Sequence, residues 1–159
     1  MNPLLYTHPA CLAHDPGQGH AECPQRLLNV LDALRTEFPS LPWQIAPAAL
    51  RSQLARVHRA SLIDAILDRS AFDNGRHNTR RLDRDTVRSE GSAEAALRCA
   101  AAGVAGVGAV PAGDAERAPC AVRPPGHHAN DAPVSGLLLV TSVAAAPGPA
   151  LATAAPRPH

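Results

Sequence analysis

The sequence predicts an α/β domain in which helices cover a parallel sheet. Three short apolar runs, at residues 3–8, 43–46 and 119–122, have the length and composition of buried strands. Helical patterns separate these runs, and the longest of them cover residues 24–38 and 92–110. Strands that alternate with helices are typical of layered α/β folds. The length of 159 residues suits one such domain.

The first strand, at residues 3–8, is followed by a loop rich in glycine and proline and then by a helix. Pro24 suits the first turn of that helix. Leu27, Leu31 and Leu34 follow at helical spacing and predict one apolar face. Two prolines then end the helix ahead of the second predicted strand.

Two short helices are expected before the middle of the chain. Leu50, Leu54 and Val57 indicate the first of them, and the apolar face of residues 60–69 indicates the second. Residues 70–90 are polar and charged. We therefore expect an exposed loop there.

A long Ala-rich helix is predicted over roughly residues 92–110. Ser89 or Ser92 can cap its N-terminus, and Pro111, Gly113 and Asp114 are expected to stop it. The strand at residues 119–122 comes next, and a loop containing two prolines leaves its carboxyl end. We assign residues 1–143 to the folded domain. The Pro- and Ala-rich residues 144–159 have no periodicity and predict a disordered tail.

Charge and cysteine content restrict the class of protein. The net charge is +1, from 15 basic and 14 acidic residues, so neither nucleic acid nor an anionic membrane is expected as a partner. The start of the chain lacks a basic secretory leader, and no apolar run approaches the ~18 residues of a spanning helix. The four cysteines are expected to stay reduced. These features predict a soluble, cytoplasmic protein.

The stretch CAVRPPGHHAN places two adjacent histidines, His127 and His128, just after the last predicted strand. Ligands of open α/β sheets bind at the carboxyl ends of the strands. Imidazole titrates near neutral pH, so the pair could act as general base and general acid. The alternative is a surface loop whose histidines have no function.

The stretch AVRPPGHHA closely resembles the signature loop of the histone deacetylase superfamily. Three further stretches occur in family order: YTHPACLAHDPGQGHAECPQRLLNVLDAL, RVHRASLIDAI and LDRDTVRSEGSAEAALRCAAAGV. Together they span about residues 4–136 and resemble bacterial members related to class II deacetylases and acetylpolyamine amidohydrolases. The resemblance implies the N-terminal portion of a three-layer, arginase/deacetylase-like fold.

The resemblance also implies an activity. Family members use a zinc ion to hydrolyse the amides of acetyl-lysine or acetylpolyamines. Carried over, His127 and His128 are the proton-transfer pair and Asp85 is the loop carboxylate that accepts hydrogen bonds from the substrate backbone. Gly136 matches the glycine that lines the acyl channel. Asp85 could instead be a turn or helix-cap residue, and Gly136 a plain turn glycine.

The chain departs from the family at the metal. Family members supply zinc ligands from an Asp-x-His motif and a later aspartate, and an electrophilic tyrosine follows. This chain has no Asp-x-His, and after His128 its only candidates are Asp131 and His159. Its only tyrosine is Tyr6, near the other end. The resemblance thus implies zinc, but we assign no metal ligand and expect this chain alone to be inactive.

A second metal site needs consideration. Cys11, His14, His20 and Cys23 have the spacing C-x2-H-x5-H-x2-C, and four such ligands would suit a closed structural zinc site. The simpler alternative is that Cys11 packs as a small apolar residue. On that alternative His14 and His20 belong to the family's loop near the active-site rim.

The resemblance is expected to end beyond Ala146, where proline and alanine dominate. This composition suggests a truncated or frameshifted reading frame from a GC-rich genome. Three functional hypotheses follow. The first is a zinc-dependent deacetylase that acts on acetyl-lysine or acetylpolyamines. The second is a non-catalytic protein, either an inactive remnant or a binding module. The third is one half of a split enzyme that a separate polypeptide completes.

Overall fold

The computed structural model describes residues 2–68, 70, 72, 79–82, 86–126 and 140. The predicted domain boundary at residue 143 and the predicted disordered tail, 144–159, lie outside these residues. In chain order the elements are β1 (Leu5–Thr7), the 3-10 helix η1 (Pro9–Ala13), α1 (Pro24–Glu37), β2 (Trp43–Ile45), α2 (Arg51–Leu54), α3 (Ala60–Leu67), β3 (Thr79–Arg81), β4 (Val87–Ser89) and α4 (Ser92–Ala112).

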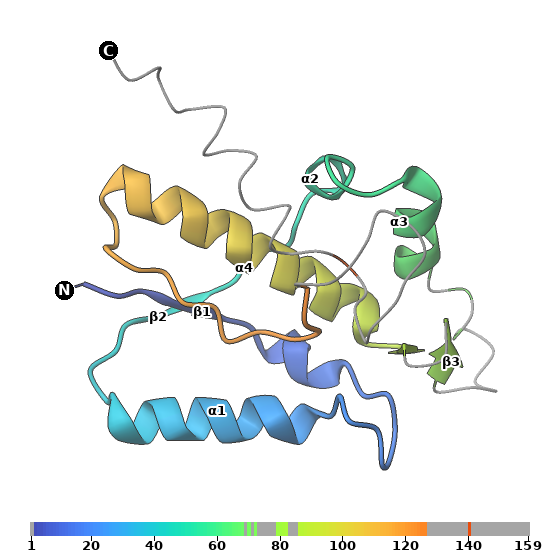
Figure 1. The fold of residues 1–159 in the computed structure, drawn as a ribbon, viewed down its shortest axis with the longest axis horizontal. Helices are drawn as coiled ribbons and strands as arrows, with labels where there is room; N and C mark the ends of the chain where they lie inside the picture. Colours follow the sequence, from blue (N-terminus) through green and yellow to red (C-terminus); the bar gives the residue numbers. More distant parts are fainter. Residues whose placement is uncertain are drawn as a thin grey trace.

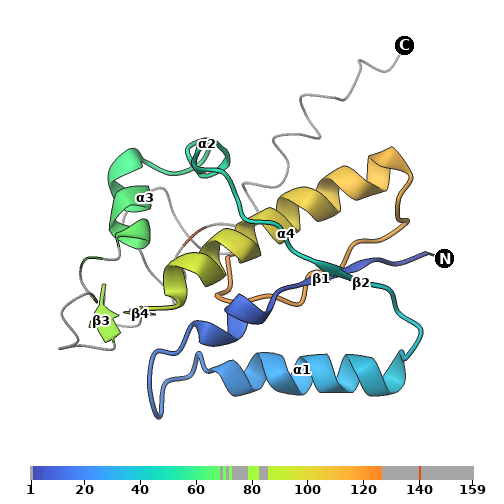
Figure 2. The ribbon, with the colours of Figure 1, turned by 180° about the vertical axis from the view of Figure 1, so that it is seen from behind.

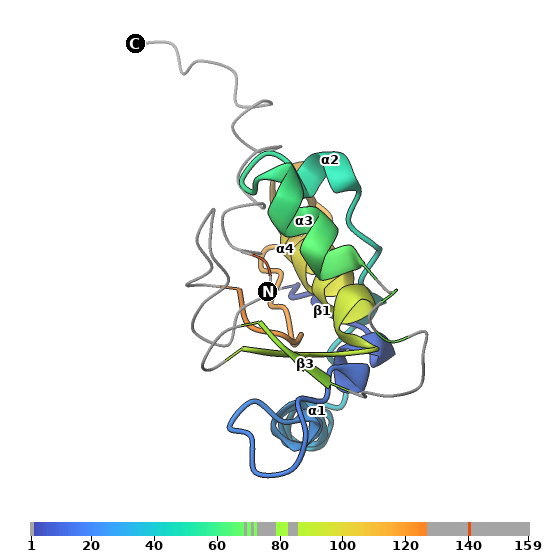
Figure 3. The same cartoon turned by 90° about the vertical axis from the view of Figure 1, so that its right-hand side faces the viewer.

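A small parallel sheet lies between two helical layers. Strand β1 pairs with β2 in parallel, with Leu5 opposite Trp43 and Thr7 opposite Ile45. On its other side β1 forms one parallel bridge to the predicted third strand, from Tyr6 to Cys120, and a second bridge joins Pro3 to Arg117 just outside both segments. Figures 1 and 3 show α1 on one side of β1 and α4 with α3 on the other. The predicted parallel sheet with helices on both faces is confirmed.

Strand β1 is buried on both faces, which explains its continuous apolar run. Leu5 packs into a cluster with Leu27 and Leu31 of α1. Tyr6 points the other way and packs with Ala46 and with Ala102 of α4. Full burial of one leucine contributes roughly 1.5–3 kcal/mol, so these few contacts hold α1 on the sheet.

The helices that apolar periodicity predicts are present. Helix α1 begins with Pro24 in its first turn, as expected. Helices α2 and α3 lie within the two short helices predicted, although α3 ends at Leu67, two residues before the predicted end. Ile63 and Ile66 of α3 are buried against Ala100 of α4, so the apolar face predicted for α3 is the face that packs.

Helix α4 differs from its prediction at both ends. Its N-cap is Gly91, which gives no side-chain cap, and Ser92 is the first helical residue. The helix runs through Pro111 to Ala112 and ends at Gly113, which has the left-handed conformation typical of a helix C-terminus. The predicted stop at Pro111, Gly113 and Asp114 is thus confirmed at Gly113, although the helix continues through Pro111. A proline in the last turn removes one hydrogen bond where the helix is already ending.

The prediction of an exposed loop over residues 70–90 holds for the exposure of residues 79–81 but is wrong for residues 86–89, which are buried, and for the absence of strands. Strands β3 and β4 pair antiparallel there, with Arg81 opposite Val87. Every residue of β4 is buried. The predicted loop thus contributes a buried strand that leads into α4.

Arg88 explains why a polar stretch can be buried. Its side chain is fully buried, and its guanidinium donates to the carbonyl oxygens of Ala65 (2.7 Å) and Asp68. The guanidinium also lies 4.9 Å from the ring centre of Phe72, a cation–π distance. Because these partners replace water, one arginine joins β4 to the end of α3.

Helix α4 also corrects the expectation that no segment is apolar and long enough to cross a membrane. By length and composition alone its 21 residues pass that test, with a mean hydropathy of 1.4. Packing explains this composition, because α4 contacts η1, β1 and α3 and much of it is buried. Figure 2 shows the chain after α4 returning beneath that helix toward η1.

Candidate active site

The segment before the histidine pair lies alongside β1 and is joined to it by an isolated parallel bridge between Tyr6 and Cys120. The Tyr6 N–H donates to the carbonyl of Pro119, and the Ala121 N–H donates to the carbonyl of Tyr6, both at 2.9 Å. The Thr7 hydroxyl donates to the carbonyl of Ala121 at 2.7 Å. Of the strand predicted over residues 119–122, the structure contains a single bridged residue, Cys120, with hydrogen bonds to β1 on both sides of it. Residues 123–126 then leave its carboxyl end.

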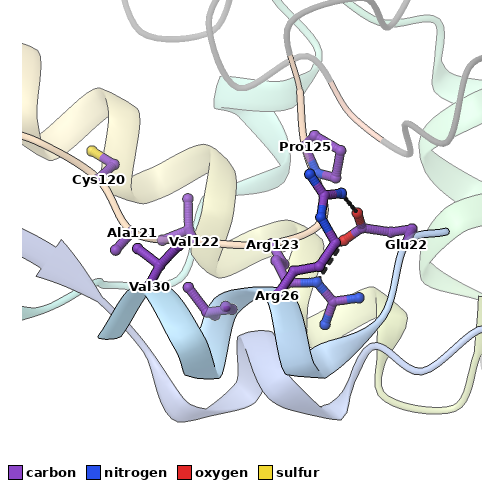
Figure 4. Close-up of a pocket in the computed structure, with 9 residues that line it drawn as sticks. Glu22, Arg26, Val30, Cys120, Ala121, Val122, Arg123 and Pro125 are labelled. Carbon is purple, nitrogen blue, oxygen red and sulfur yellow. Dashed lines mark hydrogen bonds and ion pairs between the residues drawn. The ribbon is translucent and has the colours of Figure 1, made fainter. Parts of the chain in front are cut away.

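Arg123 anchors this segment to the N-terminal loop. Its side chain is buried, and its Nε donates to Oε1 of Glu22 at 2.5 Å. Its Nη1 donates to the carbonyl oxygens of Cys11 (3.1 Å) and His14 (2.9 Å). Figure 4 shows Arg123 and Glu22 pointing toward each other across the space beside α1. One guanidinium therefore joins the end of the third strand to two segments about 100 residues earlier.

Glu22 is the buried carboxylate of this pair and has a second cationic partner. Its Oε2 accepts a hydrogen bond of 2.8 Å from Nη1 of Arg26, which lies one turn into α1 and is mostly exposed. The backbone N–H of Glu22 donates to Nδ1 of His20 at 3.1 Å. A carboxylate with two guanidinium partners balances the buried charge of Arg123, which would otherwise be costly.

His14 lies beside this network and is almost fully buried. Its Nδ1 is 2.7 Å from Oγ of Ser92, which also accepts a hydrogen bond of 2.7 Å from the Ser89 N–H. Burial lowers the pKa of His14 to about 4, and the charges of Arg123 and His20 act in the same direction. The imidazole is therefore neutral at pH 7. It ties the loop after η1 to the start of α4.

A cavity of about 270 Å³ lies between α1 and residues 120–125. Its polar groups are the side chains of Glu22, Arg26 and Arg123, and the rest of its wall is largely apolar. The cavity borders residues 120–125, which lead to His127. The Arg123–Glu22 pair therefore lies beside the segment that precedes the predicted catalytic histidines. Its lining is Glu22, Arg26, Leu27, Val30, Cys120, Ala121, Val122, Arg123 and Pro125.

Comparison with known proteins agrees with this arrangement. A sequence profile of the histone deacetylase domain matches residues 20–152, which include both Glu22 and Arg123. The chain belongs to the histone deacetylase family. The match extends past Ala146, where we expected the resemblance to end, so that prediction was wrong.

Two relatives show how much of the family domain this deacetylase-family chain represents. It is 33% identical over 131 residues to the histone deacetylase-like amidohydrolase of Pseudomonas aeruginosa, covering 80% of this chain and 33% of that protein. It also matches the crystal structure of the HDA15 HD domain, with a TM-score of 0.84 and 26% identity. That match covers 96% of this chain and 44% of the solved one. The chain thus spans well under half the length of these relatives.

The four site residues predicted from sequence, His127, His128, Asp85 and Gly136, lie outside the described residues. The structure does place the backbone that leads to the histidine pair, as far as Gly126. The roles of His127, His128, Asp85 and Gly136 therefore stay predictions. On the two sides of residues 83–85, the described Leu82 N–H donates to the carbonyl of Thr86 at 2.9 Å.

A family metal does not fit the side chains that the structure describes. Among those residues no three histidine, cysteine, aspartate or glutamate side chains gather as metal ligands. The alternative structural zinc site of Cys11, His14, His20 and Cys23 is therefore not supported. Cys11 packs instead in the apolar cluster under α1, and burial raises the pKa of its thiol. The simpler prediction for Cys11 is confirmed.

Tyr6 does not replace the family's electrophilic tyrosine. Its ring is buried in β1 beside Ala46 and Ala102, and burial raises the pKa of its hydroxyl. It serves the core of this family member, as its place in an apolar run suggests.

Sequence reasoning missed the buried polar residues Arg123, Glu22 and Ser92. Arg123 and Glu22 stand within the motifs that carried the family resemblance, yet the residues selected as functional were His127, His128, Asp85 and Gly136. The available signal was an arginine directly after an apolar strand, because a charged residue at such a position needs a buried partner. The identity of that partner, Glu22, came only from the fold.

Proposed function

We propose that this chain is the part of an amidohydrolase that holds the proton-transfer histidines for removing acetyl groups from amines. The substrate classes are acetyl-lysine side chains and acetylpolyamines. The proposal rests on family membership and on the motif that ends in His127 and His128. It assigns the hydrolysis to the family domain as a whole and the acid–base groups to this chain.

The single observation that carries the proposal is the buried Arg123–Glu22 pair. Arg123 stands four residues before His127, and its guanidinium has three buried acceptors on two other segments. A catalytic group needs such support, because small displacements of an acid–base residue reduce the rate strongly. A surface loop with histidines of no function has no need of a buried arginine anchor.

The proposed chemistry uses the two imidazoles in turn. One accepts a proton as water adds to the amide carbonyl carbon. The C–N bond then breaks, and a proton passes from the imidazole pair to the leaving nitrogen. The products are acetate and the free amine. Each transfer suits a group that titrates near neutral pH.

The family implies a metal cofactor, and the resemblance specifies zinc. The described residues do not provide its ligands, and the sequence has no Asp-x-His motif. We therefore propose that zinc, where the whole domain uses it, is bound by residues outside the described part of this chain. A catalytic zinc site needs three protein ligands and one open position for water or substrate.

A second candidate function follows from the same observation. A family member that binds acetylated ligands without hydrolysing them needs the rim of the site but no metal. This alternative predicts binding of an acetylated substrate by the chain with no turnover, whatever polypeptide is added.

A chimera tests the proposed function directly. This chain replaces the matched part of the Pseudomonas aeruginosa amidohydrolase, and hydrolysis of an acetyl-lysine peptide and of acetylputrescine is measured. We expect turnover that falls at least about 100-fold in His127→Ala and in His128→Ala, the usual contribution of an acid–base group. His77→Ala serves as the matched control and keeps the activity. A folded chimera without turnover, or one that is insensitive to both histidine variants, contradicts the proposal.

A further inference from the structure

Strand β2 has one edge that faces solvent. The Ala46 N–H donates to the carbonyl of Thr7 at 2.8 Å, so the even-numbered residues of β2 face β1. Backbone groups alternate along a strand, and the N–H and C=O groups of Trp43 and Ile45 therefore point away from β1. In the described part of the chain, β1 is the only strand that pairs with β2. Ile45 is 59% exposed, so this edge is accessible to another strand.

The segment that carries this edge has no charge. Residues 41–50, with the sequence LPWQIAPAAL, contain no acidic or basic side chain. Exposed edges are commonly protected by lysine or another charged residue, which opposes pairing with a second edge. Groups that lie near a two-fold axis meet their own copies, so a charged group there would repel itself. The neutral edge of β2 is therefore suited to meeting a second copy of the same edge.

An apolar cavity of about 290 Å³ lies beside this edge, between β2 and α1. Trp43 and Ile45 line the cavity together with Leu31 of α1. The side chains of Trp43 and Ile45 thus lie on the same face of the sheet, the face that α1 covers. An exposed isoleucine next to a tryptophan gives the open edge an apolar surface that burial would stabilise.

We infer that the β2 edges of two copies of this chain pair antiparallel across a two-fold axis and form a homodimer. In this pairing Trp43 lies opposite Ile45 of the second copy, and Gln44 lies on the axis. An antiparallel pair whose backbone groups face each other exchanges two hydrogen bonds. The two Trp43–Ile45 pairs therefore form four hydrogen bonds and use every outward N–H and C=O of these residues. The inference rests on the β2 edge and does not depend on the proposed function.

The chain itself selects this register. A pairing centred on Trp43 would place Ile45 opposite Leu41, whose N–H already donates to the carbonyl of Phe38 at 3.0 Å. A pairing centred on Ile45 would place Trp43 opposite Pro47, which has no N–H. Only the register centred on Gln44 satisfies both outward residues of each copy.

The side chains favour the same register. Residues directly opposite each other in an antiparallel pair have their side chains on the same face, and a pair of an aromatic and a β-branched residue is stabilising. Each Trp43 would thus pack against Ile45 of the second copy at the mouth of the cavity beside α1. This cavity and the cavity beside Arg123 have no lining residue in common, so the dimer leaves the candidate active site uncovered.

Analytical ultracentrifugation of the full chain tests the inference. We expect the mean mass to rise from the 16.5 kDa of one chain toward twice that value between about 1 and 200 µM, since the interface is small. Ile45→Lys should weaken association at least about tenfold, because each dimer would then bury two charges. Ile45→Pro removes an outward N–H and should weaken association as strongly, whereas Ile45→Val keeps this N–H and the β-branch and should change the Kd less than about threefold.

A matched variant separates this edge from other surfaces. Val30→Lys makes the same type of change at a 48% exposed residue of α1 that lies beside residues 119–121, on the other side of β1 from β2. It should change the Kd less than about twofold. Circular dichroism checks that each variant is folded.

A cysteine on the two-fold axis tests the register without relying on a loss of binding. Gln44→Cys is made in a background with Cys23→Ser and Cys120→Ser. Opposite residues of a pair without mutual hydrogen bonds have Cα atoms about 4.5 Å apart, which is within the range for a disulfide. Mild oxidation should therefore give a covalent dimer. Gln25→Cys, at an exposed position of α1 in the same background, should remain mostly monomeric.

Each outcome decides the inference. A concentration-dependent dimer that Ile45→Lys weakens and Gln44→Cys cross-links supports it. A chain that stays monomeric over the whole concentration range overturns it, as does a dimer that Ile45→Lys leaves unchanged or that Val30→Lys weakens equally. Equal cross-linking of Gln25→Cys and Gln44→Cys also overturns it. Hydrolysis by the chimera is measured separately, so the two proposals can fail independently.

Discussion

Substitution of Glu22 by glutamine should destabilise the fold strongly. The change is nearly isosteric but removes the negative charge that faces Arg123 at 2.5 Å. Both side chains are about 95% buried, so the remaining guanidinium cannot recover its hydration. Loss of one partner from a buried ion pair typically costs about 3–5 kcal/mol. Because domains are stable by only about 5–15 kcal/mol, this single change removes a large share of the total.

Urea unfolding monitored by circular dichroism measures this effect. With a urea dependence of about 2 kcal/mol per molar for a domain of this size, the midpoint should fall by about 2 M. Glu37→Gln is the matched control, because Glu37 is exposed at the end of α1 and its midpoint should barely change. Combining Glu22→Met with Arg123→Met removes both charges and should recover part of the loss.

The reasoning on the buried pair is refuted by a specific result. If Glu22→Gln costs less than about 1 kcal/mol, as a surface ion pair would, then Arg123 is not held in the buried network described above. A double variant that is less stable than Glu22→Gln alone also contradicts the argument. It would mean that the two carbonyl contacts of Arg123 outweigh its ion pair with Glu22.

Three further predictions concern other buried contacts. Folding lowers the pKa of His14 from 6.5 to about 4, so between these pH values the unfolded state binds more protons than the folded state. Lowering the pH from 6.5 to 4 should therefore reduce the free energy of unfolding by about 3 kcal/mol. An H14N variant should not show this loss. Gly91→Ala should lower the thermal midpoint markedly, since its Cβ would lie 2.6 Å from Cβ of Ala13, whereas Gly108→Ala has open space and should stabilise α4 slightly. Arg88→Ala should cost at least about 2 kcal/mol in urea unfolding, because it leaves two carbonyl acceptors at the end of α3 without their donor; a loss under about 0.5 kcal/mol contradicts this.

Apolar spacing and short apolar runs in the sequence predicted the helices and strands whose burial follows from those patterns. Helix α1 followed from Pro24 and from leucines at helical spacing, and β1 and β2 followed from short apolar runs. Strand β4 could not be found in this way, because its middle residue is arginine and charged residues stand close on both sides, at Asp85 and Glu90. Its burial depends on carbonyl oxygens and a ring that α3 and Phe72 bring to Arg88.

The candidate site was predictable only in part. The motif located the loop that follows the third strand, and the structure describes that loop as far as Gly126. The groups that hold it were not predictable from local sequence, since Glu22 and Arg123 are separated by 101 positions and meet only when the sheet forms. The predicted serine cap of α4 was missed for a similar reason, and so was the continuation of the helix through Pro111. Ser92 uses its hydroxyl for the His14 contact and for the Ser89 N–H, and Pro111 is tolerated in a last turn.

The most direct test of the account compares the zinc content of this chain alone with that of the chimera. Both are purified in the same buffer with zinc added and are then dialysed and analysed by mass spectrometry. The account predicts about one zinc per chimera and less than about a tenth per chain alone, because three ligands are needed for a stable catalytic site. One zinc per chain alone, retained through dialysis, would contradict it. That result would place the ligands within this chain.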